Sequence, residues 1–224
     1  MQHVRMCVLV GAALLCGILA SGIAYGQHGG GLHGPHRFED PKQWSKAFDA
    51  ADRDGWQKPN EVLAALKLRP DAIVADIGAG TGYFTVRLAQ LVPSGTVYAV
   101  DIEEGMLGFI ADRAKKTGLE NVRTAKGSAD SPNLPEKVDL VLIVDTYHHI
   151  DARVSYLGKI AASLKPGGRI AIVDFRLDAQ RGAPKQMRLS PSLVQDEMRA
   201  AGFEQVEAHD FLPDQYFLIF QRKV

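Results

Sequence analysis

Short apolar runs alternate with longer amphipathic stretches from Ile73 to the end of the chain. Continuous apolar runs of about four to eight residues are typical of buried strands, whereas apolar positions that recur every three or four residues predict helices. The run at 138–144, "VDLVLIV", is apolar on both faces and so predicts a central strand. In all, the pattern predicts strands at 73–77, 96–100, 122–125, 138–144, 169–175, 206–209 and 216–221.

The amphipathic stretches between these runs predict helices at 83–91, 103–117 and 154–164, and a further helix that begins at Ser190-Pro191. Gly118, the "KPGG" stretch after Leu164, and Gly202 are expected to end them. Regular alternation of strand and helix is typical of an α/β fold, with a doubly wound parallel sheet covered on both faces. The ligand crevice of such a sheet lies at the carboxyl ends of its strands, where the strand order reverses.

The part of the chain before Asp71 follows a different pattern. Residues 6–20 are uncharged and follow Arg5, and small residues end this stretch at Gly26, so we expect residues 1–26 to be a signal peptide or an N-terminal anchor. Residues 27–36 are rich in glycine and histidine and predict a linker, and 37–70 predict a helical extension that packs on the domain at 71–224. The chain is then exported, periplasmic or membrane-anchored, and the alternative is a cytoplasmic protein.

Charge and cysteine content exclude several classes of protein. The chain has 26 basic and 26 acidic residues, whereas a nucleic-acid-binding protein usually presents a basic face. Both cysteines, Cys7 and Cys16, lie in the predicted leader. A cleaved chain would therefore have no disulfide, no thiolate metal site and no cysteine nucleophile. We expect no metal centre.

A glycine loop follows the first predicted strand in "VADIGAGTGYF". Gly78, Gly80 and Gly82 lie where a chain turns sharply and presents its backbone to a ligand. A dinucleotide fingerprint needs its third glycine at position 83, which is Tyr83, and a phosphate loop needs a lysine that is missing here. The spacing favours contact with an uncharged amino-acid and ribose portion of a cofactor, and the alternative is a tight structural turn.

An acidic residue ends the second predicted strand. Asp101 follows the glycine loop by one predicted helix and one predicted strand, and a carboxylate at this tip can accept hydrogen bonds from both ribose hydroxyls. The alternative is an ordinary solvated carboxylate.

Four motifs occur in order along the chain: "VADIGAGTGYFTVRLA", "VYAVDIEEGML", "VDLVLIVDTYHHI" and "LKPGGRIAIVDF". Together they resemble the class I S-adenosylmethionine-dependent methyltransferases, especially the branch of ubiquinone and menaquinone biosynthesis, over about residues 56–220. The resemblance implies a Rossmann-like, seven-stranded sheet with an antiparallel last strand. It also implies a methyltransferase domain at 71–224 and S-adenosylmethionine as cofactor.

The resemblance also implies roles for single residues. Asp76 would pair with the cofactor's ammonium group, and the alternative is that Asp76 caps the helix that follows. Where the family usually has Gly-Asp, this chain has Ala129 before the acid. The cofactor-binding positions implied are the loop residues Gly78, Ala79, Gly80 and Gly82 around the methionine part, Asp101 on the ribose, Ile102 and Asp130 on the adenine, and Asp145 near the amino end.

Methyl transfer needs an acceptor held in line with the cofactor, and a base where the acceptor carries a proton. In "DTYHHI", His148 and His149 are candidates either for this base or for the wall of the acceptor pocket. In an extended chain the two would point to opposite sides, so at most one would face the site. We expect a small or lipid-like acceptor, with membrane proximity through the N-terminal segment. The alternative is a non-catalytic module that binds S-adenosylmethionine or a nucleoside.

Overall fold

The computed structural model of the chain describes residues 40–223. The predicted leader (1–26) and linker (27–36) lie outside the described residues. Within the described part, seven strands form one sheet in the order β3-β2-β1-β4-β5-β7-β6. The strands are β1 (Ile73–Ile77), β2 (Thr96–Asp101), β3 (Val122–Lys126), β4 (Val138–Val144), β5 (Leu164–Phe175), β6 (Phe203–His209) and β7 (Gln215–Arg222).

Strands β1 to β5 are parallel, and β7 pairs antiparallel with both β5 and β6. The predicted seven-stranded sheet with an antiparallel last strand is therefore confirmed. β4 is buried along almost its whole length between β1 and β5, as its apolar sequence predicted.

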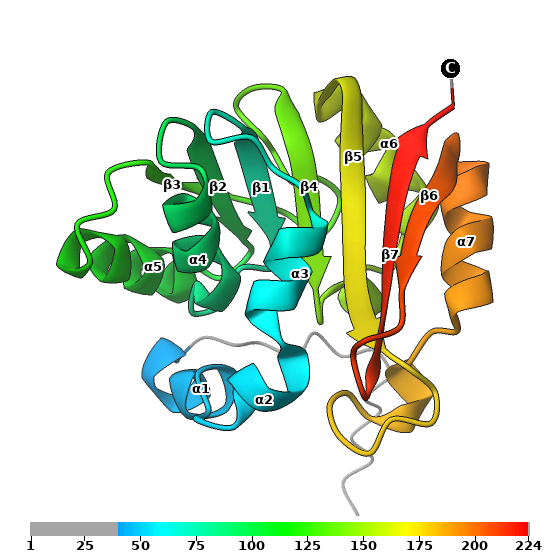
Figure 1. Cartoon of the computed structure of the whole chain (residues 1–224), viewed down its shortest axis with the longest axis horizontal. Coiled ribbons are helices and arrows are strands. Elements are labelled where there is room, and N and C mark those ends of the chain that lie inside the picture. The colour runs from blue at the N-terminus through cyan, green and yellow to red at the C-terminus, as the bar shows by residue number, and fades with distance from the viewer. Residues whose placement is uncertain (1–39, 224) are drawn as a thin grey trace, which may run out of the picture. The chain divides into compact units, whose positions relative to one another are not determined.

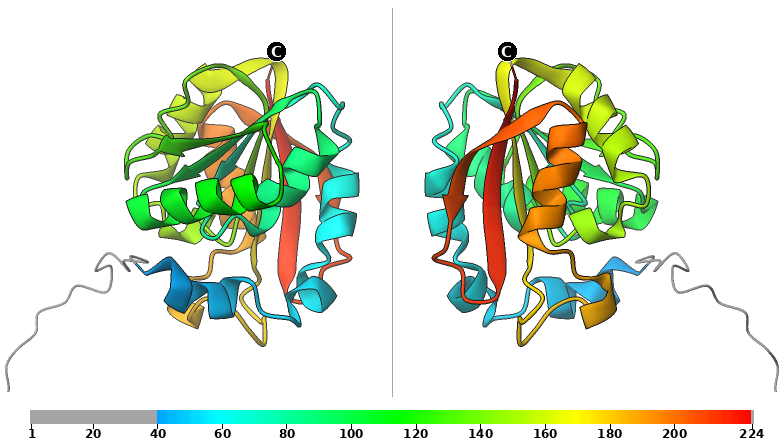
Figure 2. Two further views of the ribbon diagram at one scale, coloured as in Figure 1. Left: turned by 90° about the vertical axis from the view of Figure 1, so that its left-hand side faces the viewer. Right: turned by 90° about the vertical axis from the view of Figure 1, so that its right-hand side faces the viewer.

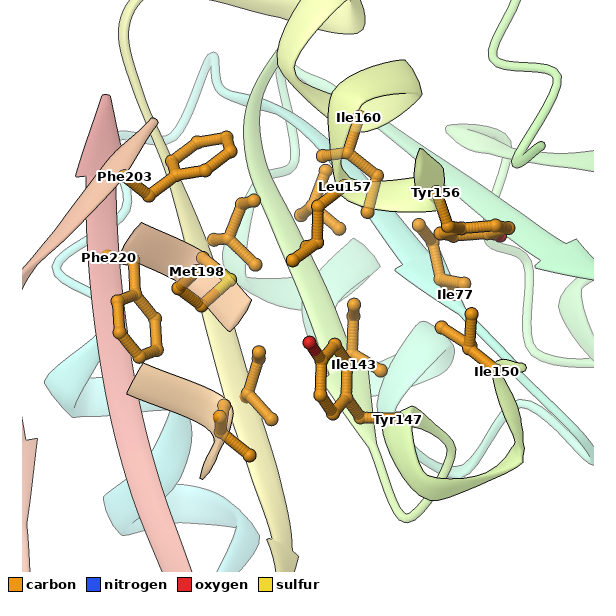
Figure 3. Close-up of a cluster of buried hydrophobic side chains, with 14 of the residues drawn as sticks. Ile77, Ile143, Tyr147, Ile150, Tyr156, Leu157, Ile160, Met198, Phe203 and Phe220 are labelled. Atoms are coloured by element: carbon orange, nitrogen blue, oxygen red, sulfur yellow. The ribbon is translucent and has the colours of Figure 1, made fainter. Parts of the chain in front are cut away.

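Helices cover both faces of the sheet, which is seen edge-on in Figure 2. One face packs on α3 and α4, and the other packs on α6 and α7 through a cluster that includes Tyr147, Leu157, Met198 and Phe220 (Figure 3). The helices are α1 (Pro41–Phe48), α2 (Arg53–Gln57), α3 (Pro59–Ala65), α4 (Tyr83–Leu91), α5 (Glu104–Lys116), α6 (Arg153–Ser163) and α7 (Pro191–Ala200), with short 3₁₀ turns η1 (Tyr147–His149) and η2 (Lys185–Met187).

The "KPGG" stretch differs from its prediction. We expected a loop here before a strand at 169–175, but β5 begins at Leu164, directly after α6. Leu164 already pairs with Val138, and the register then shifts so that Arg169 pairs with Leu140. Residues 165–168 of β5 lie between these two pairs opposite Asp139 alone on β4, and Gly167 takes a φ of 75° within this irregularity. Pairing with β4, which is not a local property, decides where the strand begins.

The described part of the N-terminal extension contains the helices α1, α2 and α3. Asp40 starts α1 by accepting a hydrogen bond from the backbone N–H of Lys42 at 2.9 Å. Lys58, with a φ of 44°, separates α2 from α3. Within residues 40–223 no helix combines the length and the apolar character that crossing a membrane requires.

This arrangement fixes where a ligand can bind. The strand order reverses at β1, which lies between β2 and β4. The carboxyl ends of the parallel strands meet along one edge, and α1 and α2 lie across that edge in Figure 1. The switch point therefore lies under the N-terminal extension.

Candidate functional site

The loop between β1 and α4 has a left-handed backbone at all three of its glycines. The φ angles of Gly78, Gly80 and Gly82 are 73°, 55° and 80°. Residues that have a Cβ atom rarely adopt this backbone conformation. The amides of Gly78 and Ala79 donate to the carbonyl oxygen of Val100 at 2.8 and 3.0 Å. The loop is thereby tied to the end of β2, at the switch point where the sequence placed it.

Two of these glycines have close neighbours from other elements. A Cβ atom on Gly78 would lie 2.2 Å from Thr146 Oγ1, and one on Gly80 would lie 3.3 Å from the ring of Phe48. The close contact with Thr146 by itself requires glycine at position 78. This agrees with a tight structural turn, which was the alternative left open by the sequence. Gly80 instead faces the end of α1.

Asp76 is buried beside this loop. The residue is 3% exposed, and its carboxylate accepts a hydrogen bond from Thr85 Oγ1 at 2.6 Å. α4 starts after Gly82, which has no side chain to cap it, while Asp76 contacts Thr85 in the first turn of this helix, so the alternative that Asp76 caps the helix stays a prediction beside its cofactor role. Burial raises the pKa of Asp76 to about 6, against the opposing effect of the hydrogen bond from Thr85. Thr81 Oγ1 is also buried here, with no hydrogen-bond partner among the described residues.

Asp101 ends β2, as predicted, and faces the glycine loop. Its two oxygens accept hydrogen bonds from the amides of Gly80 at 2.8 Å and Glu103 at 2.9 Å. Burial raises the pKa of Asp101, and these amides oppose the shift. The neighbouring Ile102 is 52% exposed, and Asp130 is exposed at the tip of a turn closed by Ser128 and Ser131.

Asp145 follows β4 with a left-handed φ of 52°. It accepts hydrogen bonds from the side-chain amides of Gln57, at 3.0 Å, and Gln215. The guanidinium of Arg53 lies 3.7 Å from its Oδ2. Burial raises the pKa of Asp145 to about 6, and the charge of Arg53 opposes the shift. Sequence reasoning missed these three partners, which come from α2 and from the start of β7.

The two candidate histidines lie in the 3₁₀ turn η1, and the centroids of their rings are 4.2 Å apart. The assumption of an extended chain, in which the two side chains would point to opposite sides, was therefore wrong. His148 Nδ1 lies 2.9 Å from both carboxylate oxygens of Asp174, and both side chains are 3% exposed. His149 is exposed. Asp174, one residue before the end of β5, was not picked out from the sequence although it stands in the quoted motif "IAIVDF".

The arrangement suits S-adenosylmethionine chemically. That cofactor carries an ammonium group, a carboxylate, a sulfonium and a ribose diol. Carboxylates that are largely removed from solvent at the ends of three neighbouring strands (Asp76, Asp101 and Asp145) can pair with its cationic and hydroxyl groups, and the unpartnered hydroxyl of Thr81 can donate or accept. Residues 40–223 contain no group of three or more histidine, cysteine, aspartate or glutamate side chains that could hold a metal ion.

Comparison with known proteins points the same way. Residues 68–222 match the family described as "Methyltransferase domain". The chain is 33% identical over 107 residues to a malonyl-[acyl-carrier protein] O-methyltransferase of Methylococcus capsulatus. The aligned segment covers 47% of this chain and 38% of that protein. It is 32% identical over 111 residues to a ubiquinone/menaquinone biosynthesis C-methyltransferase of Ectopseudomonas mendocina, covering 48% and 43%. The match thus spans less than half the length of these two relatives.

A solved structure resembles the whole domain. The S-adenosylmethionine-dependent methyltransferase of Aquifex aeolicus superposes with a TM-score of 0.75 at 25% identity, covering 81% of this chain and 97% of that one. The matched family covers the sheet, the glycine loop and the strand-end acids described above. The chain therefore belongs to the methyltransferase-domain family, among the class I S-adenosylmethionine-dependent methyltransferases.

Proposed function

We propose that this chain transfers a methyl group from S-adenosylmethionine to a small-molecule or lipid-like acceptor, at an oxygen or carbon that loses a proton. The family supports the reaction class, and the two relatives named above are an O- and a C-methyltransferase. The observation that carries the proposal is the buried pair of His148 and Asp174 side chains at the edge where β4 and β5 end.

The pair has the geometry of a base and the group that orients it. Because Nδ1 of His148 faces a carboxylate, we infer that Nδ1 carries the proton and that Nε2 is left to accept one. Asp174 is itself fixed by the backbone amides of Phe175 and His148, at 2.8 and 3.2 Å. It would stabilise the imidazolium that forms when the acceptor's proton arrives. The cofactor, when bound, supplies an electrophilic methyl group.

The cofactor roles implied by the family resemblance belong to the same proposal. The glycine loop and Asp101 would hold the methionine and ribose parts, Ile102 would pack on the adenine, and Asp145 would lie at the amino end. Asp130 is the least supported of these positions, because it is exposed and follows Ala129.

His148→Asn tests the base directly. The amide nitrogen of asparagine can keep the hydrogen bond to Asp174, while the accepting Nε2 is lost. With radiolabelled S-adenosylmethionine and a panel of phenolic, quinol and carboxylic acceptors, we expect kcat to fall about 10²- to 10⁴-fold, the usual contribution of a general base. The remaining rate should rise with pH, because hydroxide then removes the proton. His149→Asn, at the exposed neighbouring residue, is the matched comparison and should keep most of the activity.

The outcomes separate the possible functions. Equal activity of the His148→Asn and His149→Asn variants, with unchanged thermal unfolding, would refute the base and leave the methyltransferase in place. Binding of S-adenosylhomocysteine without product from any acceptor would favour a non-catalytic binding module.

We also propose that residues 1–26 direct the chain out of the cytoplasm or anchor it in the membrane. The support is the uncharged stretch at 6–20 after Arg5, with small residues ahead of Gln27. N-terminal sequencing of the protein from its native cell tests this: a chain that begins at Gln27 supports cleavage, and one that begins at Met1 in the soluble fraction contradicts both alternatives.

A further inference from the structure

Residues 48–57, here called the covering segment, lie across the switch point (Figure 1). Its residues contact elements on both sides of the glycine loop. Phe48 faces Gly80, and Asp49 forms an ion pair with Arg113 of α5 at 2.8 Å. Asp54 contacts Arg87 of α4 at 3.0 Å. The covering segment therefore forms one wall of any ligand site at this edge.

One cation of this segment, Arg53, points inward. Its side chain is only 11% exposed, and its guanidinium lies 3.9 Å from the centroid of the Tyr83 ring. Nε donates to Gln57 Oε1, and Nη1 donates to the carbonyl oxygen of Phe48. Burial lowers the pKa of Arg53, with Asp145 the largest opposing charge, and an arginine remains protonated under such conditions.

The second terminal nitrogen of this guanidinium is poorly paired. Among the described residues no hydrogen bond engages Nη2 of Arg53, and its ion-pair contact with Asp145 Oδ2 spans 3.7 Å. The oxygens of Asp145 already accept from Gln57 and Gln215. A cation and an anion, both largely buried, thus lie side by side without a direct hydrogen bond. Two largely buried charges of opposite sign gain less from each other at this distance than in a direct, hydrogen-bonded ion pair, so the pair is suited to a ligand that bridges it.

We propose that Arg53 binds the carboxylate of the cofactor's amino-acid moiety, while Asp145 takes the neighbouring ammonium. The two charged groups of an α-amino acid are attached to one carbon, and the site offers one largely buried charge of each sign 3.7 Å apart. The planar guanidinium can present Nη2 to a carboxylate oxygen. This inference depends on the family's cofactor and is independent of the proposed base.

Two ligands that differ in this moiety test the inference by calorimetry. S-adenosylhomocysteine has the amino-acid group, and 5′-methylthioadenosine keeps the nucleoside and the sulfur but lacks it. We expect Arg53→Met, which keeps an apolar stem over Tyr83, to raise the Kd of S-adenosylhomocysteine about 10- to 100-fold, the usual range for a hydrogen bond to a charged group. The Kd of 5′-methylthioadenosine should stay within about twofold, because the lost contact lies outside it. Arg53→Lys, which keeps the charge but not the fork, should show an intermediate loss.

Arg87→Ala is the matched control, because Arg87 also stacks on Tyr83, at 4.1 Å, and pairs with an acid of the covering segment. It should leave both affinities unchanged. Three results would overturn the inference. An equal loss of affinity for both ligands in Arg53→Met would mean that Arg53 only holds the covering segment in place, and tighter binding of S-adenosylhomocysteine by this variant would mean that Arg53 blocks the site. The third result is an Arg87→Ala variant that loses affinity for S-adenosylhomocysteine alone. A wild-type chain that binds only 5′-methylthioadenosine would refute it as well, whereas loss of the His148 base would not affect it.

Discussion

Gly78→Ala tests whether the glycine loop is shaped by the residue that follows β4. The new Cβ would lie 2.2 Å from Oγ1 and 2.3 Å from Cγ2 of Thr146, and the φ of 73° would be retained. The left-handed backbone costs a residue with a Cβ about 1–2 kcal/mol, and overpacking of a tight site adds about 1–3 kcal/mol. We therefore expect the free energy of unfolding to fall by about 2–5 kcal/mol in urea titrations, with far-ultraviolet circular dichroism as the probe.

A double-mutant cycle divides this loss into its two parts. Thr146→Gly removes the three atoms nearest to the new Cβ, so most of the steric part should be recovered in the double variant and the backbone part should remain. Gly108→Ala is the control: Gly108 lies within α5 with no neighbour near its Cβ position, and alanine there should stabilise the chain by about 0.5–1 kcal/mol. A Gly78→Ala variant that differs from wild type by less than about 0.5 kcal/mol, or a cycle with no coupling, would show that the close approach to Thr146 is not a constraint.

Four further results are expected. The pKa values of Asp76 and Asp145 are raised to about 6, so protonation below that pH removes the anionic partners of the cofactor's ammonium group. The affinity for S-adenosylhomocysteine should therefore fall as the pH drops from 7 to 5. An affinity that does not change with pH would contradict these roles. In the same window the ligand-free chain should gain stability from these two groups, since their folded-state pKa lies above the ordinary value and the folded chain binds the extra protons. Asp101→Ala should weaken S-adenosylhomocysteine by about 1.5–3 kcal/mol in calorimetry, and an unchanged affinity would mean that the ribose lies elsewhere. Arg188→Ala should speed proteolysis of the loop after β5, because Arg188 donates to four backbone carbonyls of that loop; equal cleavage rates would refute this.

The order and type of the elements could be predicted from the sequence because the apolar runs are short, separate and bounded by glycine. β4 is the clearest case, since a run that is apolar on both faces can only be central in a sheet covered on both sides. The start of β5 could not be predicted, because Leu164 joins the sheet through its pairing with Val138. Local signals at "KPGG" favour a break, and a partner strand that lies beyond α6 in the sequence overrides them.

The site shows the same division between local and distant information. Asp101 could be identified because it ends a recognisable strand, next to the glycine loop that it contacts. Gln57 contacts Asp145 across 88 residues of sequence, and His148 contacts Asp174 across 26. Strand order and the path of the N-terminal extension bring these side chains together. Neither property can be predicted from the local sequence around each residue.

Four of the five parallel strands carry an aspartate at or beside the carboxyl end: Asp76, Asp101, Asp145 and Asp174. The fold does not require acids at this edge, since the residues directly before Asp145 and Asp174 are the buried apolar side chains Val144 and Val173. Burying carboxylates costs free energy, as the raised pKa values of Asp76, Asp101 and Asp145 show, and among them only Asp145 has a cation of the described residues within 4 Å. A protein without net charge thus places two buried carboxylates, Asp76 and Asp101, at one edge with no cation of the described residues within 4 Å. Such a charge is best offset by a ligand that brings its own cations, as a sulfonium compound with an ammonium group does.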